Sequence, residues 1–121
     1  MFKINFYRDA QGKQPIKEYL VDLAGKSDKD SRIKLNKIDY YLQALSKYGT
    51  RLGEPFIKHI DGEIWELRPL RDRFFFFCWK GESFVLLHHF VKKTQKTPKK
   101  EIEQAKRNLK DYIERSGKNE N

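Results

Sequence analysis

The chain begins with alternating apolar and polar positions. Phe2, Ile4 and Phe6 are separated by single, more polar residues, and this period of two predicts a strand with one covered face. From Pro15 onward, apolar residues recur three and four positions apart until the pattern stops before Gly25. This second spacing, with proline at its start, predicts a helix that follows the strand.

A longer helical pattern comes after a short Gly-Lys-Ser link. Ser27 with Asp30 three residues later resembles a capping box, and Gly49 marks the end of the pattern. The apolar stripe between these ends consists of Leu35, Ile38, Tyr41, Leu42, Leu45 and Tyr48. Because the link is short, the two helices are expected to form an antiparallel hairpin.

Four strand-like runs of apolar residues follow the helices. They span residues 56–60, 64–70, 74–79 and 83–91 and are separated by the turn-like pairs Asp61-Gly62, Arg71-Asp72 and Lys80-Gly81. This order predicts an antiparallel meander, whose central strands are apolar on both faces and therefore covered by helices on one side and largely enclosed on the other. Thr97 and Pro98 then predict the start of a last helix that ends at about Arg115.

Together these elements predict one α+β domain over residues 1–115, with an antiparallel-rich sheet, a two-helix hairpin after the first strand and a C-terminal helix. Residues 116–121 form a polar tail, and Cys78, inside an aromatic run, is expected to be a small buried hydrophobe. No apolar run is long enough to cross a bilayer, and the N-terminus lacks the pattern of a secretion signal. We therefore expect a cytoplasmic protein that makes no membrane contact.

The chain is strongly basic. Its 121 residues include 26 Lys and Arg against 17 Asp and Glu, which gives a formal charge of +9 with neutral histidines. Such a balance favours a polyanionic partner, either nucleic acid or an acidic protein. With one cysteine, and with His59 far in sequence from the other two histidines, no metal-ligand spacing is present, so neither a metal nor a cofactor is expected.

Charged residues return where the strands end. Period two places Glu66 and Arg68 on the same face of one strand, and Arg73 opens the next. The last strand closes with His88, His89, Lys92 and Lys93. Antiparallel pairing of the last two strands would bring Arg73 next to these residues. A basic cluster built from sequence-distant segments is thus predicted.

Residues 58–105 carry a specific pattern of motifs. It comprises Lys58, Gly62, the run IWELR at 64–68, Arg73 before an aromatic strand, the run VLLHHFVKKTQKTP at 85–98, Glu101, Ile102 and Ala105. This pattern resembles the RelE/HigB-like toxins of bacterial type II toxin–antitoxin pairs, in particular their phage-related branch. The chain departs from it at His89, where many relatives have Gly, and at 74–77, where they often have Tyr. The resemblance implies a compact RelE-like fold.

The resemblance also implies an endoribonuclease that cuts mRNA, usually on the translating ribosome, and so inhibits translation and growth. The ribose 2′-OH would attack the adjacent phosphate without a metal. We assign phosphate stabilisation to Arg68 and Arg73, because a guanidinium can bind two phosphate oxygens at once. The candidates for proton transfer are His89 in preference to His88, then Lys92, with Glu66 as an alternative base. Further phosphate contacts are expected from Lys58, Arg71, Lys93 and Lys96.

As partner, the resemblance implies a cognate helix-turn-helix antitoxin that inhibits the toxin, with DNA bound only through the complex. Two other functions remain open from the residues alone. The chain could be a non-catalytic nucleic-acid-binding module, or a structural subunit that docks the antitoxin. The first would use the basic cluster only to hold phosphates, and the second would use its basic face to dock an acidic protein. Taken residue by residue, Arg68 and Glu66 could also form an ordinary ion pair, and the lysines could be a solvated segment. At least one of His88 and His89 is expected to be structural, because adjacent strand residues face opposite ways.

Overall fold

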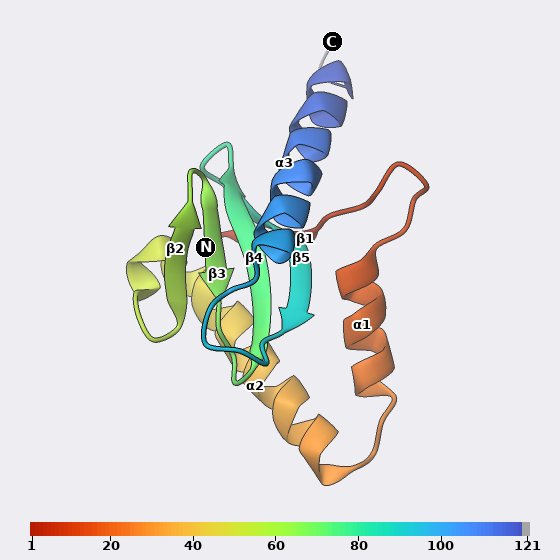
Figure 1. The fold of residues 1–121 in the computed structure, drawn as a ribbon, viewed down its shortest axis with the longest axis vertical. Coiled ribbons are helices and arrows are strands. Elements are labelled where there is room, and N and C mark those ends of the chain that lie inside the picture. Colours follow the sequence, from red (N-terminus) through yellow and green to blue (C-terminus); the bar gives the residue numbers. More distant parts are fainter. Residues whose placement is uncertain (120–121) are drawn as a thin grey trace.

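The computed structural model describes residues 1–119. Its elements are β1 (Lys3–Phe6), α1 (Pro15–Ala24), α2 (Lys29–Tyr48), the short 3-10 helix η1 (Gly49–Leu52), β2 (Ile57–Asp61), β3 (Ile64–Leu67), β4 (Asp72–Trp79), β5 (Ser83–Val91) and α3 (Lys99–Asn119). Figure 1 shows one sheet with helices packed around it. The predicted α+β fold is confirmed, including the two helices after the first strand and the C-terminal helix.

The sheet has the strand order β1-β5-β4-β3-β2. Strands β2 to β5 pair with their sequence neighbours in antiparallel fashion, as the predicted meander requires. β1 instead pairs with β5 in parallel, with Lys3 opposite Ser83 and Phe6 opposite Leu86. A parallel neighbour must be reached by a crossover, and the segment containing α1 and α2 belongs to that connection.

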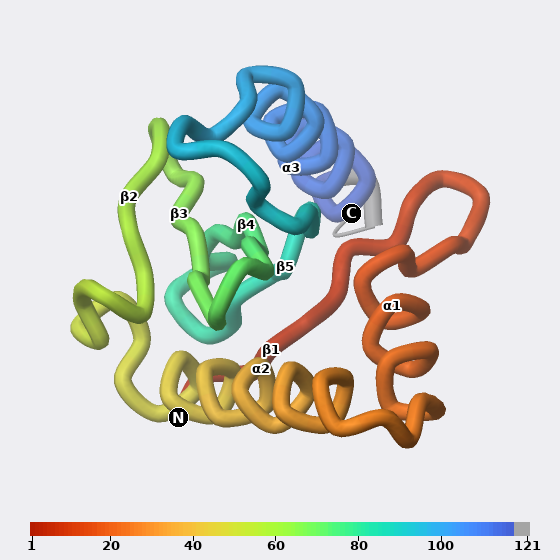
Figure 2. The backbone as a smooth tube through the Cα atoms, turned by 60° about the horizontal axis from the view of Figure 1, so that its bottom comes forward, coloured from red at the N-terminus to blue at the C-terminus, as the bar shows by residue number. Residues whose placement is uncertain are grey.

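Strand β4 is buried on both of its faces. Phe74 and Phe76 pack into a core with residues of α1 and α2, whereas Phe75 and Phe77 pack into a second core with residues of α3. These four rings are at most 1% exposed. Figure 2 shows α2 and α3 on opposite sides of the sheet. The predicted enclosure of the second face is therefore provided by the C-terminal helix.

The ends of α1 agree with the sequence, but the start of α2 does not. Pro15 is in the first turn of α1, and Gly25 follows its last residue. The N-cap of α2 is Asp28, whose carboxylate accepts a hydrogen bond of 3.0 Å from the amide of Ser31. The capping box predicted at Ser27 is thus wrong by one residue, because the Asp28 side chain reaches the free amide three positions on.

The predicted apolar stripe of α2 is correct except at its end. Ile38 and Leu45 are completely buried, whereas Tyr48 is 50% exposed. At 3.6 residues per turn, Tyr48 points about 80° away from Ile38, ten residues earlier. The helical geometry therefore places the Tyr48 ring outside the buried face of α2.

Cys78 is exposed, contrary to the prediction of a buried thiol. It is opposite Phe84 and only two residues before the Lys80-Gly81 turn. Phe76, which precedes it on the same face, is fully buried. Helical cover of this face therefore ends between these two residues of β4.

Several element ends differ from the sequence prediction. β3 ends at Leu67 rather than Leu70, because the chain turns there and Leu70 adopts a left-handed φ of 56°. α3 begins at Lys99, one residue after Pro98, and continues to Asn119, beyond the predicted end at Arg115. Residues 120–121 of the predicted tail lie outside the described residues. Within residues 1–119, no helix has the length and apolar character needed to span a membrane.

The contrast between the two faces of α2 gives a stability prediction. Leu45→Ala should lower the free energy of unfolding by about 2–5 kcal/mol, because it leaves a cavity at a fully buried position. Tyr48→Ala, on the exposed face, should change it by no more than about 0.5 kcal/mol. Urea denaturation of both variants measures this, and equal losses would contradict the assignment of the faces.

Candidate functional site

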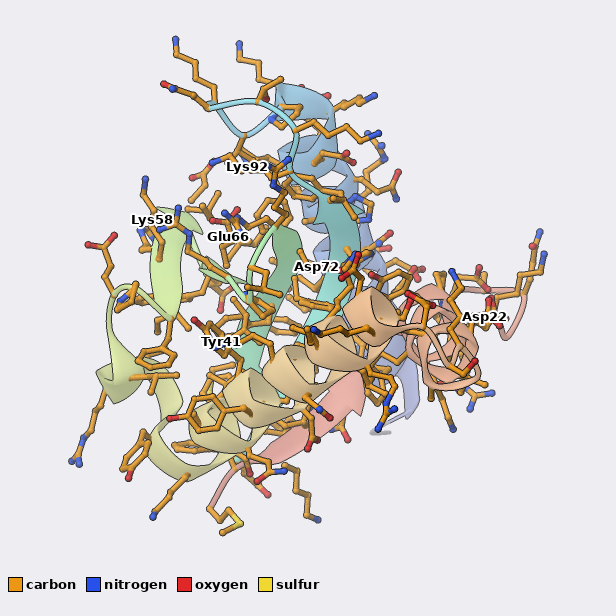
Figure 3. All side chains as sticks on the ribbon, turned by 90° about the horizontal axis from the view of Figure 1, so that it is seen from below. Asp22, Tyr41, Lys58, Glu66, Asp72 and Lys92 are labelled. Carbon is orange, nitrogen blue, oxygen red and sulfur yellow. The ribbon has the colours of Figure 1, made fainter. Side chains whose placement is uncertain are left out.

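Four cationic side chains surround one carboxylate at one end of the sheet. Lys58 on β2 is directly opposite Glu66 in the antiparallel register with β3. Arg73 is near the start of β4, and Arg68 and Lys92 directly follow β3 and β5. Figure 3 shows Lys58, Glu66 and Lys92 close together on one side of the molecule. We call Lys58, Arg68, Arg73 and Lys92 the basic cluster.

Glu66 is the buried centre of the basic cluster. Its side chain is 1% exposed, and its Oε1 is 3.3 Å from Arg68 Nε and 3.9 Å from Arg73 Nε. Burial raises the pKa of the Glu66 carboxyl, and the neighbouring positive charges, that of Arg73 foremost, only partly oppose this effect. The carboxyl therefore gains a proton more readily than an exposed glutamate does.

The Arg73 guanidinium is fixed by the backbone that precedes it. Its Nη1 donates hydrogen bonds to the carbonyl oxygens of Leu70, at 2.7 Å, and of Asp72, at 3.0 Å. Burial lowers the pKa of Arg73, while the charge of Glu66 acts against this. The turn that ends β3 early therefore supplies a carbonyl that orients the arginine.

Three atoms inside the cluster are buried without a hydrogen bond. They are Oε2 of Glu66, Nε of Arg68 and Nε of Arg73. A buried polar atom without such a partner is unfavourable and calls for an explanation. The two guanidinium nitrogens are donors, so a bound anion could satisfy them, whereas Glu66 Oε2 is left as an acceptor.

A shallow, open groove of about 490 Å³ adjoins the basic cluster. It is lined by Arg71, Arg73, Lys92, Lys93, Thr94 and Gln95. The Lys92 amide donates a 2.8 Å hydrogen bond to the Arg71 carbonyl, which joins the two loops that form the groove. Four of the six lining side chains are cationic, so the groove suits an extended anion such as a phosphate backbone.

The two adjacent histidines point to opposite sides of the sheet. Nε2 of His88 is 2.8 Å from Glu101 Oε1 at the start of α3. Nε2 of His89 is 2.7 Å from Asp72 Oδ2, and its ring stacks on Tyr19 of α1 at 4.0 Å. His89, the preferred acid or base from the sequence, therefore lies on the α1 side, whereas Glu66 packs on the α3 side.

His89 belongs to a polar network that the sequence did not predict. Asp72 is completely buried and accepts a 2.6 Å hydrogen bond from the Tyr19 hydroxyl, while Lys34 Nζ is 3.3 Å from its other oxygen. Burial alone would raise the pKa of Asp72, but the hydrogen bonds from His89 and Tyr19 outweigh it and lower the pKa. Burial, together with Asp72, raises the pKa of Tyr19. The sequence had suggested only a turn at Arg71-Asp72.

The structure brings most of the predicted site residues together. Glu66 is within the basic cluster, and Arg71 and Lys93 line the adjoining groove. Lys96 is in the same loop, where its carbonyl accepts a 2.8 Å hydrogen bond from the Thr94 hydroxyl, but it does not line the groove. Among the described residues, no group of three or more His, Cys, Asp or Glu side chains is arranged to bind a metal ion.

The raised pKa of Glu66 predicts a pH-dependent stability difference. Because the folded chain binds this proton more tightly than the unfolded chain, wild type should gain stability relative to Glu66→Gln as pH falls from 7 toward the unfolded pKa of about 4.3. Denaturant unfolding of both proteins at pH 7 and pH 5 measures the gain. If the difference in free energy of unfolding between the two proteins were the same at pH 7 and pH 5, the raised pKa of Glu66 would be contradicted.

Asp72 predicts the opposite dependence on pH. Asp72→Asn should cost about 1–3 kcal/mol at pH 7, because it weakens a buried network. The lowered pKa means that this stabilisation is present above the unfolded pKa of about 3.9 and is lost as pH falls through the folded pKa. Thermal unfolding between pH 7 and pH 3 tests this. Asp61→Asn, at an exposed carboxylate paired with Lys106, is the control and should cost less at pH 7, because solvent screens an exposed pair.

The comparisons with known proteins identify a family. Residues 26–110, about two thirds of the chain, match the model of the family described as phage-derived protein Gp49-like. No match was found among curated proteins. The matched segment extends from α2 into α3 and includes the entire basic cluster. The chain therefore belongs to the phage-derived Gp49-like family, which is associated with RelE-like toxins of toxin–antitoxin pairs.

Proposed function

We propose that this protein is the toxin of a type II toxin–antitoxin pair and a metal-independent endoribonuclease that cleaves mRNA on the ribosome. One observation carries the proposal. The guanidiniums of Arg68 and Arg73 lie against a buried carboxylate, their Nε atoms make no hydrogen bond, and Arg73 lines the adjoining cationic groove. The family association and the sequence resemblance to RelE/HigB-like toxins support the same function.

The reaction needs a charged transition state to be stabilised. The 2′-oxygen bonds to the adjacent phosphorus, the bond from phosphorus to the 5′-oxygen breaks, and the products are a 2′,3′-cyclic phosphate and a free 5′-OH. Arg73 and Arg68 would bind the oxygens of the five-coordinate phosphorus, where negative charge accumulates. The preformed hydrogen bonds of Arg73 to two carbonyls limit the reorganisation this requires.

Two side chains of the cluster are suited to move the protons. Glu66 has an unpartnered acceptor oxygen and a raised pKa, which brings it closer to the pH at which a general base is most effective. Lys92 is only partly exposed, unlike Lys93 and Lys96, and we assign to it the protonation of the leaving 5′-oxygen. We leave His89 out of the chemical step because its ring lies on the α1 side, against Asp72 and Tyr19.

The remaining cations would position the RNA. Lys58 and Arg71 flank the two arginines, and Lys93 and Lys96 extend the positive charge along the loop after β5. Contacts of this kind bind flanking phosphates without reading sequence. In this proposal a cognate helix-turn-helix antitoxin neutralises the toxin in the cytoplasm, and DNA is bound only through the complex.

A non-catalytic RNA-binding module is the second candidate. The observation that favours it is that both adjacent histidines are already bonded to carboxylates, His88 to Glu101 and His89 to Asp72. In that case the basic cluster would bind phosphates without breaking a bond. Arg73→Ala would then reduce the salt dependence of RNA binding by about one phosphate contact, and no cleavage product would form.

The proposed activity predicts a specific loss in Arg73→Ala. Induced expression of wild type should arrest bacterial growth and create new 5′-OH ends within translated mRNA. Arg73→Ala should reduce cleavage roughly 100-fold, the typical effect of removing one donor to a transition-state oxygen. Arg32→Ala on α2 removes the same charge at an exposed position outside the site, and it should retain activity.

Purified protein added to translating ribosomes separates the candidates. Cleavage by wild type and Arg32→Ala, but not by Arg73→Ala, supports the toxin. Intact mRNA, with ribosome or RNA binding demonstrated and circular dichroism confirming folding, would instead support the binding module. If neither cleavage nor RNA binding occurs, the groove has a different partner and the proposal is wrong.

A further inference from the structure

The outer face of α2 carries an exposed apolar stripe outside the basic cluster, which borders the core at Tyr40, whose ring centre is 6.4 Å from that of Phe56. Ile33, Tyr40 and Tyr48 are 47%, 59% and 50% exposed. At 3.6 residues per turn, Tyr40 is about 20° around the helix from Ile33 and Tyr48 is about 80° from Tyr40, so the three side chains fall within an arc of about 80°. Figure 2 shows α2 along one outer side of the molecule. Exposed apolar side chains grouped in this way indicate an interaction surface.

The stripe is hollowed rather than flat. Ala44 lies midway between Tyr40 and Tyr48, and the small side chain leaves a hollow of about 440 Å³ between the two rings. A second hollow of about 330 Å³ joins Tyr40 to Ile33, and a third, of about 420 Å³, adjoins Tyr48. The first hollow shares Tyr40 with the second and Tyr48 with the third, so the three form one continuous strip along the helix.

The rim of this strip is positively charged. Lys37, Lys47 and Arg51 contribute to its lining, and Lys47 Nζ is 5.3 Å from the centre of the Tyr48 ring. Asp39, next to Tyr40, is hydrogen-bonded to Gln43. An acidic partner complements this rim, whereas a second copy of the chain would bring together two proteins with a charge of +9 each.

We propose that this face of α2 binds an amphipathic helix with acidic flanks from a partner protein. Apolar side chains three and four residues apart on that helix would enter the hollows, with a branched one against Ala44, as a knob enters a hole. Its carboxylates would pair with Lys37, Lys47 and Arg51. None of these residues lines the groove beside Arg73 and Lys92, so this contact by itself leaves the groove uncovered.

The docking surface is independent of nuclease activity. Where the proposed function holds, the partner is the antitoxin, and inhibition would begin from a contact that does not occupy the phosphate-binding residues. Where it fails, the surface still predicts an acidic helical partner. The test therefore measures binding alone.

The test is a titration of the ¹⁵N-labelled full chain with a synthetic helical peptide of 21 residues, with Leu at positions a and d of each heptad and Glu on the other faces. We expect the largest amide shifts within residues 33–51. Tyr40→Ser should weaken binding roughly tenfold or more, because it removes one aromatic wall of the hollow. Val21→Ser removes an equally exposed apolar side chain from α1 and should bind as wild type does.

Two further variants make the result decisive. Ala44→Trp should abolish binding by filling the hollow, and a peptide with Lys in place of Glu should bind at least tenfold more weakly. Shifts confined to the groove at Arg73 and Lys92, or equal affinity of the two peptides, would overturn the proposal. So would an absence of shifts at millimolar peptide. Concentration-dependent self-association that Tyr40→Ser abolishes would show that a second copy is the occupant instead.

Discussion

The burial of β4 on both faces is the constraint on which the rest of the structure depends. Four consecutive phenylalanines at 74–77 are at most 1% exposed, and burying them requires cover on both sides of the sheet. α1 and α2 cover one side and α3 covers the other. Fully burying rings of this size removes a large apolar area from water, so the helices are fixed on the sheet by the sequence of a single strand.

The start of β4 shows how this arrangement positions the chemistry. Asp72 and Arg73 are adjacent in the chain and therefore face opposite sides of the sheet. Asp72 bonds to Tyr19 and His89 on the side of α1, and Arg73 joins Glu66 on the other side. The buried network on one side thus anchors the strand end whose next residue supplies a guanidinium on the other. The charges of the buried network and those of the candidate site are separated by the thickness of one strand.

The two candidate surfaces differ in physical character. The groove at Arg73 and Lys92 is open and cationic, with no apolar anchor, and suits a flexible polyanion that binds mainly through charge. The outer face of α2 combines exposed aromatic rings with a basic rim, as at Tyr40 and Lys47, and suits a structured protein segment. In the two proposals, each surface would use the excess positive charge of the chain for a different class of partner.

The sequence by itself determined the element types, the α+β class and the proximity of Arg73 to Lys92, because periodicity and strand-end positions are local properties. Tertiary structure added Lys58 and Arg68 to the basic cluster, around Glu66. Tertiary structure alone decided that β1 joins β5 in parallel and that Cys78 is exposed. It also decided which side each histidine occupies: His89 bonds to Asp72 because antiparallel pairing places their side chains on one face, near Tyr19 of α1. Such contacts join residues far apart in the chain, and no local pattern encodes which partner a side chain will meet.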